Sequence, residues 1–216
     1  MARPDLDLLS TDVYLEREGE TIGRYYAENP FDVTDQRTAI FTSCFVGWPA
    51  ARRERLLAIG AFDESFVTGE DWDAWIRMVL DGARAGLVEE PLLRYRLRPG
   101  SLTSNRPRVL RERVALLEKT ARHPALKPSE REALAVVRRR ADARASVAEA
   151  KQALLGGGSE ARRLGFALAR CPGAGLRDRL LGLAALLLPR ILGRALAARG
   201  GSGVSGHRRA KAARDG

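Results

Sequence analysis

The sequence feature that most constrains the fold is a loop that delivers adjacent acidic residues to the start of an amphipathic helix. Apolar residues at i, i+3, i+4, i+7 and i+8 form one stripe of this helix: Trp72, Trp75, Ile76, Val79 and Leu80. Gly82 stands where a left-handed cap would end the helix. Glu70, Asp71 and Asp73 therefore fall in its first turn, where unpaired backbone N–H groups and the helix dipole favour negative charge.

These acidic residues have two interpretations. Thr68 and Asp71 match the Ser/Thr-x-x-Asp/Glu capping-box pattern, which would make them a structural helix start. A carboxylate fixed at such a position could also act as a catalytic base. Other parts of the chain bear on this choice.

Charge divides the chain into two regions. Residues 1–104 carry 12 Arg and 18 acidic residues, a net charge of −6, whereas residues 105–216 carry 25 Lys plus Arg and 9 acidic residues, a net charge of +16. The asymmetry predicts an acidic globular region followed by a basic helical one. The basic faces could simply be solvated, or they could face anionic lipid, nucleic acid or an acidic partner. Because no nucleic-acid-binding module is recognisable, we expect no nucleic-acid partner.

The few cysteine and histidine residues predict neither a disulfide framework nor a metal site. Cys44 and Cys171 fit a reducing compartment, and His123 and His207 lie far apart in the sequence. No signal peptide is visible, and no stretch reaches the roughly 18 apolar residues of a spanning helix. We therefore expect a cytoplasmic protein.

The first hundred residues read as mixed strands and helices. We expect a strand over residues 7–14, a turn at 17–20, and a return strand or short helix at 21–26. Residues 39–46 are apolar enough for a buried strand, and Pro49 could open a short helix that ends at Gly60.

A second strand pattern follows at residues 87–98. Its last part alternates, with Leu93, Tyr95 and Leu97 on one face and three arginines, Arg94, Arg96 and Arg98, on the other. Three guanidinium groups on one face suit a bound phosphate or diphosphate. The same pattern also suits an exposed, charge-protected sheet edge.

From residue 109 onward the pattern is helical. We expect helices over about 109–123 and 128–156, and a third from Ser159 to about residue 171. Residues 176–198 are rich in leucine and flanked by arginine, with Pro189 inside. This segment suits the interface of an anionic membrane, or it could be a helix docked on the protein. Residues 200–216 have the composition of a disordered tail.

Three motifs resemble the family-two glycosyltransferases, which are inverting enzymes with the GT-A fold. Gly60-x-Phe62-Asp63-Glu64 is similar to the family's Gly-x-Phe-Asp-Glu. The run from Glu70 to Arg77 resembles Glu-Asp-x-Asp-x-Trp-x-Arg at the start of the acceptor-side helix. The run from Tyr95 to Ser101 is similar to the Tyr-Arg strand and Ser-containing loop that end the domain. The resemblance covers residues 38–104.

The resemblance implies an α/β fold with a mixed sheet, a partial GT-A domain, followed by an all-α extension. It implies transfer of a sugar from a nucleotide-sugar donor to a glycan or lipid-linked acceptor, as in the synthesis of cell-envelope polysaccharides. In this assignment Asp71 is the general base. The implied substrate-binding residues are Glu70, Trp72, Asp73, Arg96, Arg98 and Ser101. The non-enzymatic alternative is a membrane-surface or scaffold protein that uses its basic helices.

The sequence departs from the family at the donor side. Members bind Mg²⁺ or Mn²⁺ through an Asp-x-Asp motif in a preceding nucleotide-binding half, and we expect that half and its motif to be missing here. Asp5-Leu6-Asp7 has the letters without a preceding βαβ unit, so we interpret it as coincidence, and we assign no metal ligand. Arg98 stands where many members carry a metal-contacting His.

We expect four regions along the chain. Residues 1–104 would be the C-terminal half of a GT-A-like domain, and residues 105–175 a helical appendage. Residues 176–199 would form an amphipathic helix at the inner membrane surface, and residues 200–216 a disordered basic tail.

Overall fold

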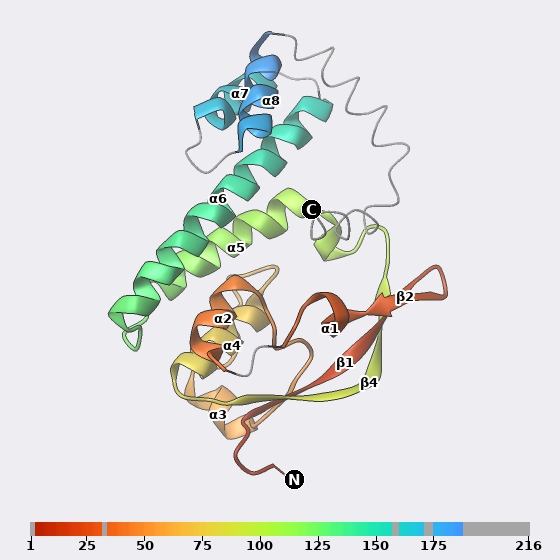
Figure 1. Ribbon diagram of the computed structural model, residues 1–216, viewed down its shortest axis with the longest axis vertical. Coiled ribbons are helices and arrows are strands. Elements are labelled where there is room, and N and C mark those ends of the chain that lie inside the picture. The colour runs from red at the N-terminus through yellow and green to blue at the C-terminus, as the bar shows by residue number, and fades with distance from the viewer. Residues whose placement is uncertain (1–2, 32–33, 157–159, 171–174, 188–216) are drawn as a thin grey trace, which may run out of the picture. The chain divides into compact units, whose positions relative to one another are not determined.

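The computed structural model describes residues 3–31, 34–156, 160–170 and 175–187 (Figure 1). Contacts divide the chain into two compact units, residues 1–142 and 143–216. The division falls inside one long helix, whereas the sequence predicts a boundary at residue 104. The predicted tail at 200–216, both predicted ends of the third helix (Ser159 and about residue 171) and the segment after residue 187 lie outside the described residues.

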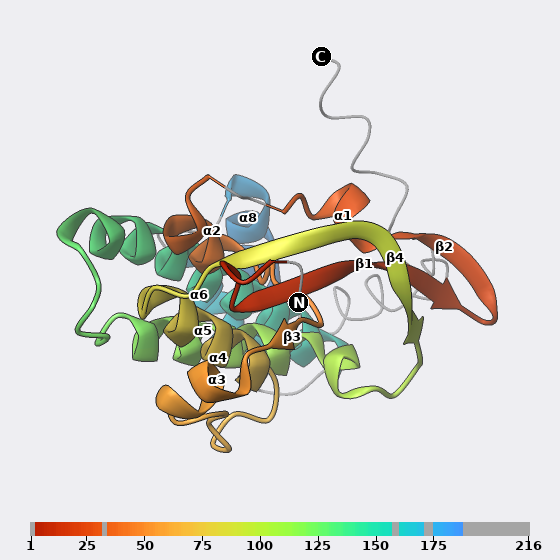
Figure 2. The ribbon, with the colours of Figure 1, turned by 90° about the horizontal axis from the view of Figure 1, so that it is seen from below.

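The first unit is built on a mixed sheet whose central strand is β1 (Leu8–Arg17). β4 (Ala85–Leu97) runs parallel to β1 along its whole length, and Figure 2 shows the two strands side by side. Two short antiparallel strands, β3 (Ala50–Ala51) and β2 (Glu20–Arg24), pair with opposite ends of the other edge of β1. The predicted first strand, the turn after it and the mixed character of the sheet are thus confirmed.

Residues 87–97 of the segment predicted at 87–98 belong to one continuous strand, β4, which has an irregularity at Pro91. The register of β4 against β1 shifts around Asp12, which is paired with Pro91. Proline has no backbone N–H for the ladder. The Thr11 hydroxyl fits between the strands here, donating to the Glu90 carbonyl at 2.5 Å and accepting from the Leu92 N–H at 3.2 Å. Polar side-chain contacts therefore bridge the shifted part of the ladder.

Residues 21–28 contain both of the structures that the sequence left open. β2 ends at Arg24, and the one-turn helix α1 (Tyr25–Glu28) follows at once. The buried carboxylate of Asp12 fixes this junction by accepting from the Arg24 guanidinium at 2.7 Å and the Tyr26 N–H at 3.1 Å.

The strand predicted at residues 39–46 is wrong. Residues 36–42 form helix α2 (Gln36–Thr42), and Asp35 caps it by accepting from the Thr38 N–H at 3.2 Å. A short apolar run cannot be assigned to helix or strand by periodicity alone. The capping aspartate just before the run marks the helix start.

Helices α2 and α4 (Glu70–Leu80) pack together, and both α3 (Arg53–Ala58) and α5 (Arg106–Thr120) contact α4. Most of the predicted stripe of α4 is buried: Trp75, Ile76, Val79 and Leu80. With Leu8, Ile40, Phe41 and Leu117 they belong to the core of the first unit. Gly82 ends α4 as predicted, with φ +89° and its N–H donating to the Val79 carbonyl at 3.1 Å.

The remaining described elements are helical, in agreement with the predicted all-α extension. A short 3-10 turn, η1 (Leu102–Ser104), leads into α5, and α6 (Pro128–Gly156) follows. In the second unit, α7 (Glu160–Arg170) packs against α8 (Leu176–Leu187). Within the described residues no helix is long and apolar enough to cross a membrane.

Candidate functional site: an exposed carboxylate at the start of α4

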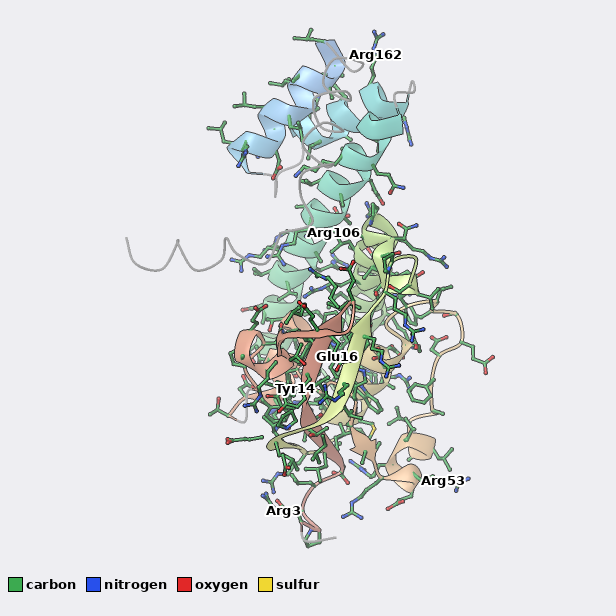
Figure 3. All side chains as sticks on the ribbon, turned by 90° about the vertical axis from the view of Figure 1, so that its right-hand side faces the viewer. Arg3, Tyr14, Glu16, Arg53, Arg106 and Arg162 are labelled. Carbon is green, nitrogen blue, oxygen red and sulfur yellow. The ribbon has the colours of Figure 1, made fainter. Side chains whose placement is uncertain are left out.

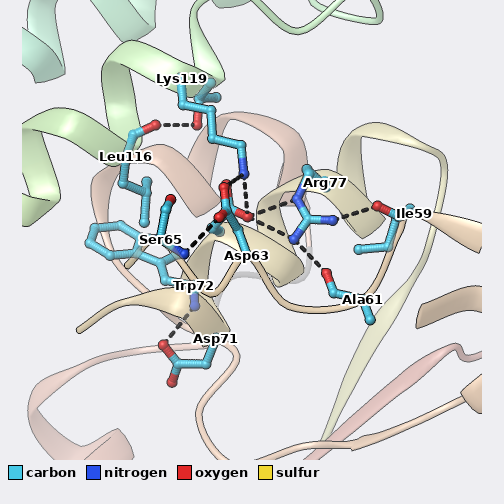
Figure 4. Close-up of polar contacts among 11 residues, drawn as sticks. Ile59, Ala61, Asp63, Ser65, Asp71, Trp72, Arg77, Leu116 and Lys119 are labelled. Carbon is cyan, nitrogen blue, oxygen red and sulfur yellow. Dashed lines mark hydrogen bonds and ion pairs between the residues drawn. The ribbon is translucent and has the colours of Figure 1, made fainter. Parts of the chain in front are cut away.

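A partly buried ion-pair network fixes the loop that precedes α4 (Figure 4). The Asp73 side chain is only 2% exposed, and its Oδ2 accepts from Arg77 Nε and from Lys119 Nζ, both at 2.8 Å. Lys119 also donates to Asp63 at 2.7 Å. Arg77 then reaches back to the carbonyls of Ile59 at 2.6 Å and Ala61 at 2.7 Å. The two acidic motifs are therefore joined to each other through a lysine of α5.

The electrostatics of Asp63 agree with this geometry. The hydrogen bond from Lys119 is the largest cause that holds the pKa of the Asp63 carboxyl below its usual range, and hydrogen bonds from Ser65 act in the same direction. The carboxylate form is favoured because all of these groups donate to it. Asp63 is thus charged at neutral pH and serves as an anchor for the loop.

Of the two interpretations, the structure does not contain the capping box of Thr68 and Asp71. The residue at the N-cap of α4 is Gly69, with φ +85°, and no side chain caps the helix there. Thr68 turns instead to α5, where Glu112 Oε2 accepts from its hydroxyl at 2.8 Å and from its backbone N–H. A glycine tolerates this left-handed backbone without steric cost, which lets the loop enter the helix while Thr68 binds elsewhere.

Asp71 is exposed, in contrast to Asp73. Its Oδ1 accepts from the backbone N–H of Trp72 at 2.6 Å, and Figure 4 shows it apart from the network around Asp63. Glu70, the first residue of the helix, is half-buried. An exposed carboxylate held at one oxygen keeps its second oxygen available to a bound hydroxyl.

Trp72 contacts the protein on several sides. Its indole N–H donates to the Ile40 carbonyl at 2.8 Å, and the Arg113 guanidinium lies over its ring, 4.6 Å from the centroid. The cation–π contact and the hydrogen bond fix the ring between α2 and α5. Trp72 therefore positions the backbone N–H that binds Asp71.

Aromatic side chains form a row of contacts that runs from Tyr25 through Trp48 to β4. The Tyr25 ring contacts Trp48 edge to face at 5.1 Å, and Trp48 contacts Tyr95 of β4 at 5.0 Å. Burial is the main cause that raises the pKa of Tyr25 and of the Cys44 thiol, and the negative charge of Asp71 adds to both. Trp48 is partly exposed and has φ +47°, a backbone conformation that non-glycine residues rarely adopt and that occurs preferentially at functional sites.

The arginines of β4, Arg94 and Arg96, are exposed. Their partners on β1, Tyr14 and Glu16, are labelled in Figure 3. Arg94 lies over the Tyr14 ring and pairs with Glu16 at 2.5 Å, while Arg96 is 3.7 Å from the other oxygen of Glu16. In the described part of the sheet β4 pairs with β1 alone, as an edge strand would. This agrees with a charge-protected edge and leaves phosphate binding as a prediction.

Arg98 and Ser101 follow the end of β4. Arg98 and Arg96 line a cavity of about 470 Å³ together with Glu16, Glu18, Gly19, Leu97 and Pro99. Ser101 is exposed, and its hydroxyl lies 3.3 Å from that of Thr103. The predicted donor-side residues thus cluster at one end of the sheet.

Among the described residues, no group of three or more His, Cys, Asp or Glu side chains is arranged to hold a metal ion. Asp5 pairs with Arg3 at 2.9 Å, and Asp7 lies 3.8 Å from Arg52 and 3.6 Å from Arg55. The carboxylates of Asp5 and Asp7 are therefore paired with arginines. The residues described do not fit the divalent cation that the resemblance implies.

Sequence reasoning missed Lys119, Glu112 and the aromatic group around Trp48. Lys119 and Glu112 lie two turns apart on α5, and each binds the loop before α4 from 44 to 56 residues away in sequence. Both stand in a helix that the sequence assigns to a separate appendage. The sequence shows that this helix has a charged face, but it does not show which residues Lys119 and Glu112 contact.

These features define a mixed α/β protein with an exposed carboxylate at the start of a helix. The chain is similar to an uncharacterized glycosyltransferase of Methanocaldococcus jannaschii, with 26% identity over 94 residues. The matched stretch covers 43% of this chain and 32% of that protein. No protein-family model and no solved structure matches the chain. This partial similarity supports a glycosyltransferase relationship.

Proposed function

We propose that residues 1–104 are the C-terminal part of an inverting GT-A glycosyltransferase domain, and that Asp71 is its general base. The observation that carries the proposal is the contrast between neighbouring acids. Asp63 and Asp73 are bound by Lys119 and Arg77, whereas Asp71 is exposed at the start of a fixed helix. The partial similarity to a protein named as a glycosyltransferase supports the same reaction class.

In the proposed reaction Asp71 takes the proton of an acceptor hydroxyl as its oxygen attacks the anomeric carbon of a nucleotide-sugar. The new bond forms on the face opposite the leaving group, and the bond from the anomeric carbon to the diphosphate oxygen breaks. The nucleotide diphosphate leaves with the electron pair, so the anomeric centre is inverted. A carboxylate within hydrogen-bond reach contributes about 10²–10⁴-fold to such a step.

The other predicted residues take supporting roles in this proposal. Glu70 would contact the acceptor, and Trp72 would orient Asp71 through its backbone N–H. Arg96 and Arg98 would neutralise the departing diphosphate, because preorganised guanidinium groups stabilise developing negative charge. Ser101 would contact the donor from the loop after β4. No step is assigned to a metal ion.

The test uses the isosteric substitution D71N. The protein is produced with any coding sequence that lies in frame upstream, and transfer or hydrolysis of nucleotide-sugars is measured. The amide oxygen introduced by D71N can still accept the Trp72 N–H but cannot take a proton. D71N should therefore lower kcat about 10²–10⁴-fold with no change in melting temperature. Full activity of D71N would remove Asp71 from the mechanism.

A further inference from the structure

Helix α8 of the second unit presents a straight row of leucines to solvent. Four leucines at spacings of four, three and four residues form this row: Leu176, Leu180, Leu183 and Leu187, with 76%, 56%, 48% and 77% exposure. At about 100° per residue they fall within one narrow stripe of the helix. A soluble protein seldom exposes large apolar side chains in a continuous line without a partner for them.

The opposite face of α8 explains why this row points outward. Gly182 and Ala185 are buried against α7, where the backbones approach closely. A Cβ atom at Gly182 would lie 2.5 Å from the Gly165 carbonyl oxygen, and one at Gly165 would lie 2.7 Å from Ala185 Cβ. Only the small-residue face of α8 can meet α7 at this distance, so the leucine row cannot turn inward.

Basic side chains flank the row. Arg177 directly follows Leu176, and Arg179 directly precedes Leu180, so the two arginines fall on opposite sides of the stripe. Both are exposed. The acidic residue between them, Asp178, is on the buried side and lies 3.5 Å from Lys151 of α6. The stripe is thus bordered by positive charge, while the negative charge is paired behind it.

We propose that the leucine row of α8 docks into the surface of an anionic lipid bilayer. Leucines would enter the acyl boundary while Arg177 and Arg179 keep their guanidinium groups among the lipid phosphates. The net charge of +16 on residues 105–216 favours an anionic surface. The leucine-rich sequence of residues 176–199 is interrupted by Pro189 and contains several arginines, so we expect α8 to lie in the interface rather than to cross the bilayer.

A second copy of the chain is a less suitable occupant. A stable protein interface uses roughly 20–30 residues on each side. Four leucines on three helical turns form a much smaller surface. Arginines on both borders of the row would also face each other in a symmetric dimer. Lipid needs no such complementary surface, because binding grows with each buried leucine and each nearby positive charge.

The test uses the full chain and sedimentation with vesicles of phosphatidylcholine alone or mixed with phosphatidylglycerol. The wild type should bind the anionic vesicles, and this binding should weaken as the salt concentration is raised. Its binding to the neutral vesicles should be at least tenfold lower. L180E/L183E should lose at least tenfold in partitioning, since each buried leucine contributes strongly to binding. Both positions are exposed, so its circular dichroism and melting temperature should match the wild type.

The matched control is L57E, which changes an exposed leucine of a helix in the first unit to the same residue. It should bind vesicles like the wild type. Absence of wild-type binding to anionic vesicles at low salt would overturn the proposal. So would unchanged binding of L180E/L183E, or a concentration-dependent dimer that this double substitution dissociates.

Discussion

Asp71 and Asp73 are separated by one residue, yet their surroundings differ completely. Two steps along a helix rotate a side chain by about 200°, which sends one carboxylate to solvent and the other toward α5. Asp73 meets Arg77 and Lys119 there, and its charge is balanced inside the protein. The helix geometry itself therefore separates an acid that stabilises the fold from one that is available for chemistry.

At the scale of single residues we predict opposite stability effects for these two acids. D73N removes the anion from a buried pair and should lower the free energy of unfolding by about 3–5 kcal/mol, because Arg77 is left without its charge partner. D71N should be close to neutral, since the new amide oxygen keeps the hydrogen bond from the Trp72 N–H. Urea unfolding followed by circular dichroism measures both values.

Lys119 gives a graded control for the same network. K119M should destabilise the protein less than D73N, because Arg77 still binds Asp73 after the change. Equal stability of the D73N variant and the wild type would show that the network does not hold the loop.

The sequence identifies the acidic residues of the site but does not show which of them are buried in ion pairs and which is exposed. The stripe of α4 fixes which positions can turn inward, and Trp75, Ile76, Val79 and Leu80 are buried as predicted. Thr68 does not take the capping role that one interpretation gives it, because its partner, Glu112, lies 44 residues away. A local capping pattern competes with long-range partners that spacing alone does not show.

At the scale of elements, Arg37 joins the end of α4 to the start of α6. It pairs with Glu130 at 2.6 Å and donates to the carbonyls of Leu80 at 2.7 Å and Ala125 at 2.8 Å. Glu130 also accepts from the Lys127 N–H at 2.9 Å, which satisfies a free donor at the start of α6. One side chain of α2 thus binds three segments of the first unit.

This contact should make stability depend on pH. The hydrogen bond from Arg37 is the first cause that holds the pKa of Glu130 below its usual value. A lowered pKa in the folded state means that the contribution is complete above the ordinary Glu value of about 4.3 and is lost as pH falls through and below it. E130Q should therefore lower stability by about 1–3 kcal/mol at pH 7 and differ little from the wild type at pH 2.

The measurement is the melting temperature of wild type and E130Q between pH 7 and pH 2. E132Q is the matched control, because Glu132 is an exposed residue on the same helix. A constant difference between wild type and E130Q at every pH would exclude the ion pair as its source.

Elements with strong periodicity or clear boundary residues can be predicted from the sequence, and short apolar runs cannot. The stripe and Gly82 fix α4, and Pro128 marks the start of α6. Residues 39–46 contain only a short apolar run, and its first part belongs to helix α2, which Asp35 caps. Pro91 interrupts the pattern of β4, and the continuity of this strand depends on the hydroxyl of Thr11, which bridges the shifted ladder there.

At the scale of the whole molecule, the two proposed surfaces belong to different compact units. The exposed Asp71 lies in the unit of residues 1–142, and the leucine row lies in the unit of residues 143–216. The net charge changes sign along the chain in the same direction, from −6 before residue 105 to +16 after it. The basic part carries the net charge that suits an anionic lipid surface, whereas the acidic part depends on individual arginines to bind an anionic donor.

Such a division predicts that the two activities can be removed separately. L180E/L183E should keep hydrolysis of a soluble nucleotide-sugar within about twofold of the wild type while losing vesicle binding, because sites without shared partners behave additively. D71N should lose the hydrolysis and keep the vesicle binding. Both assays are made on the same preparations, with hydrolysis measured in the absence of vesicles. A loss of both activities in either variant, with melting temperature unchanged, would show instead that α8 and the start of α4 act as one functional unit.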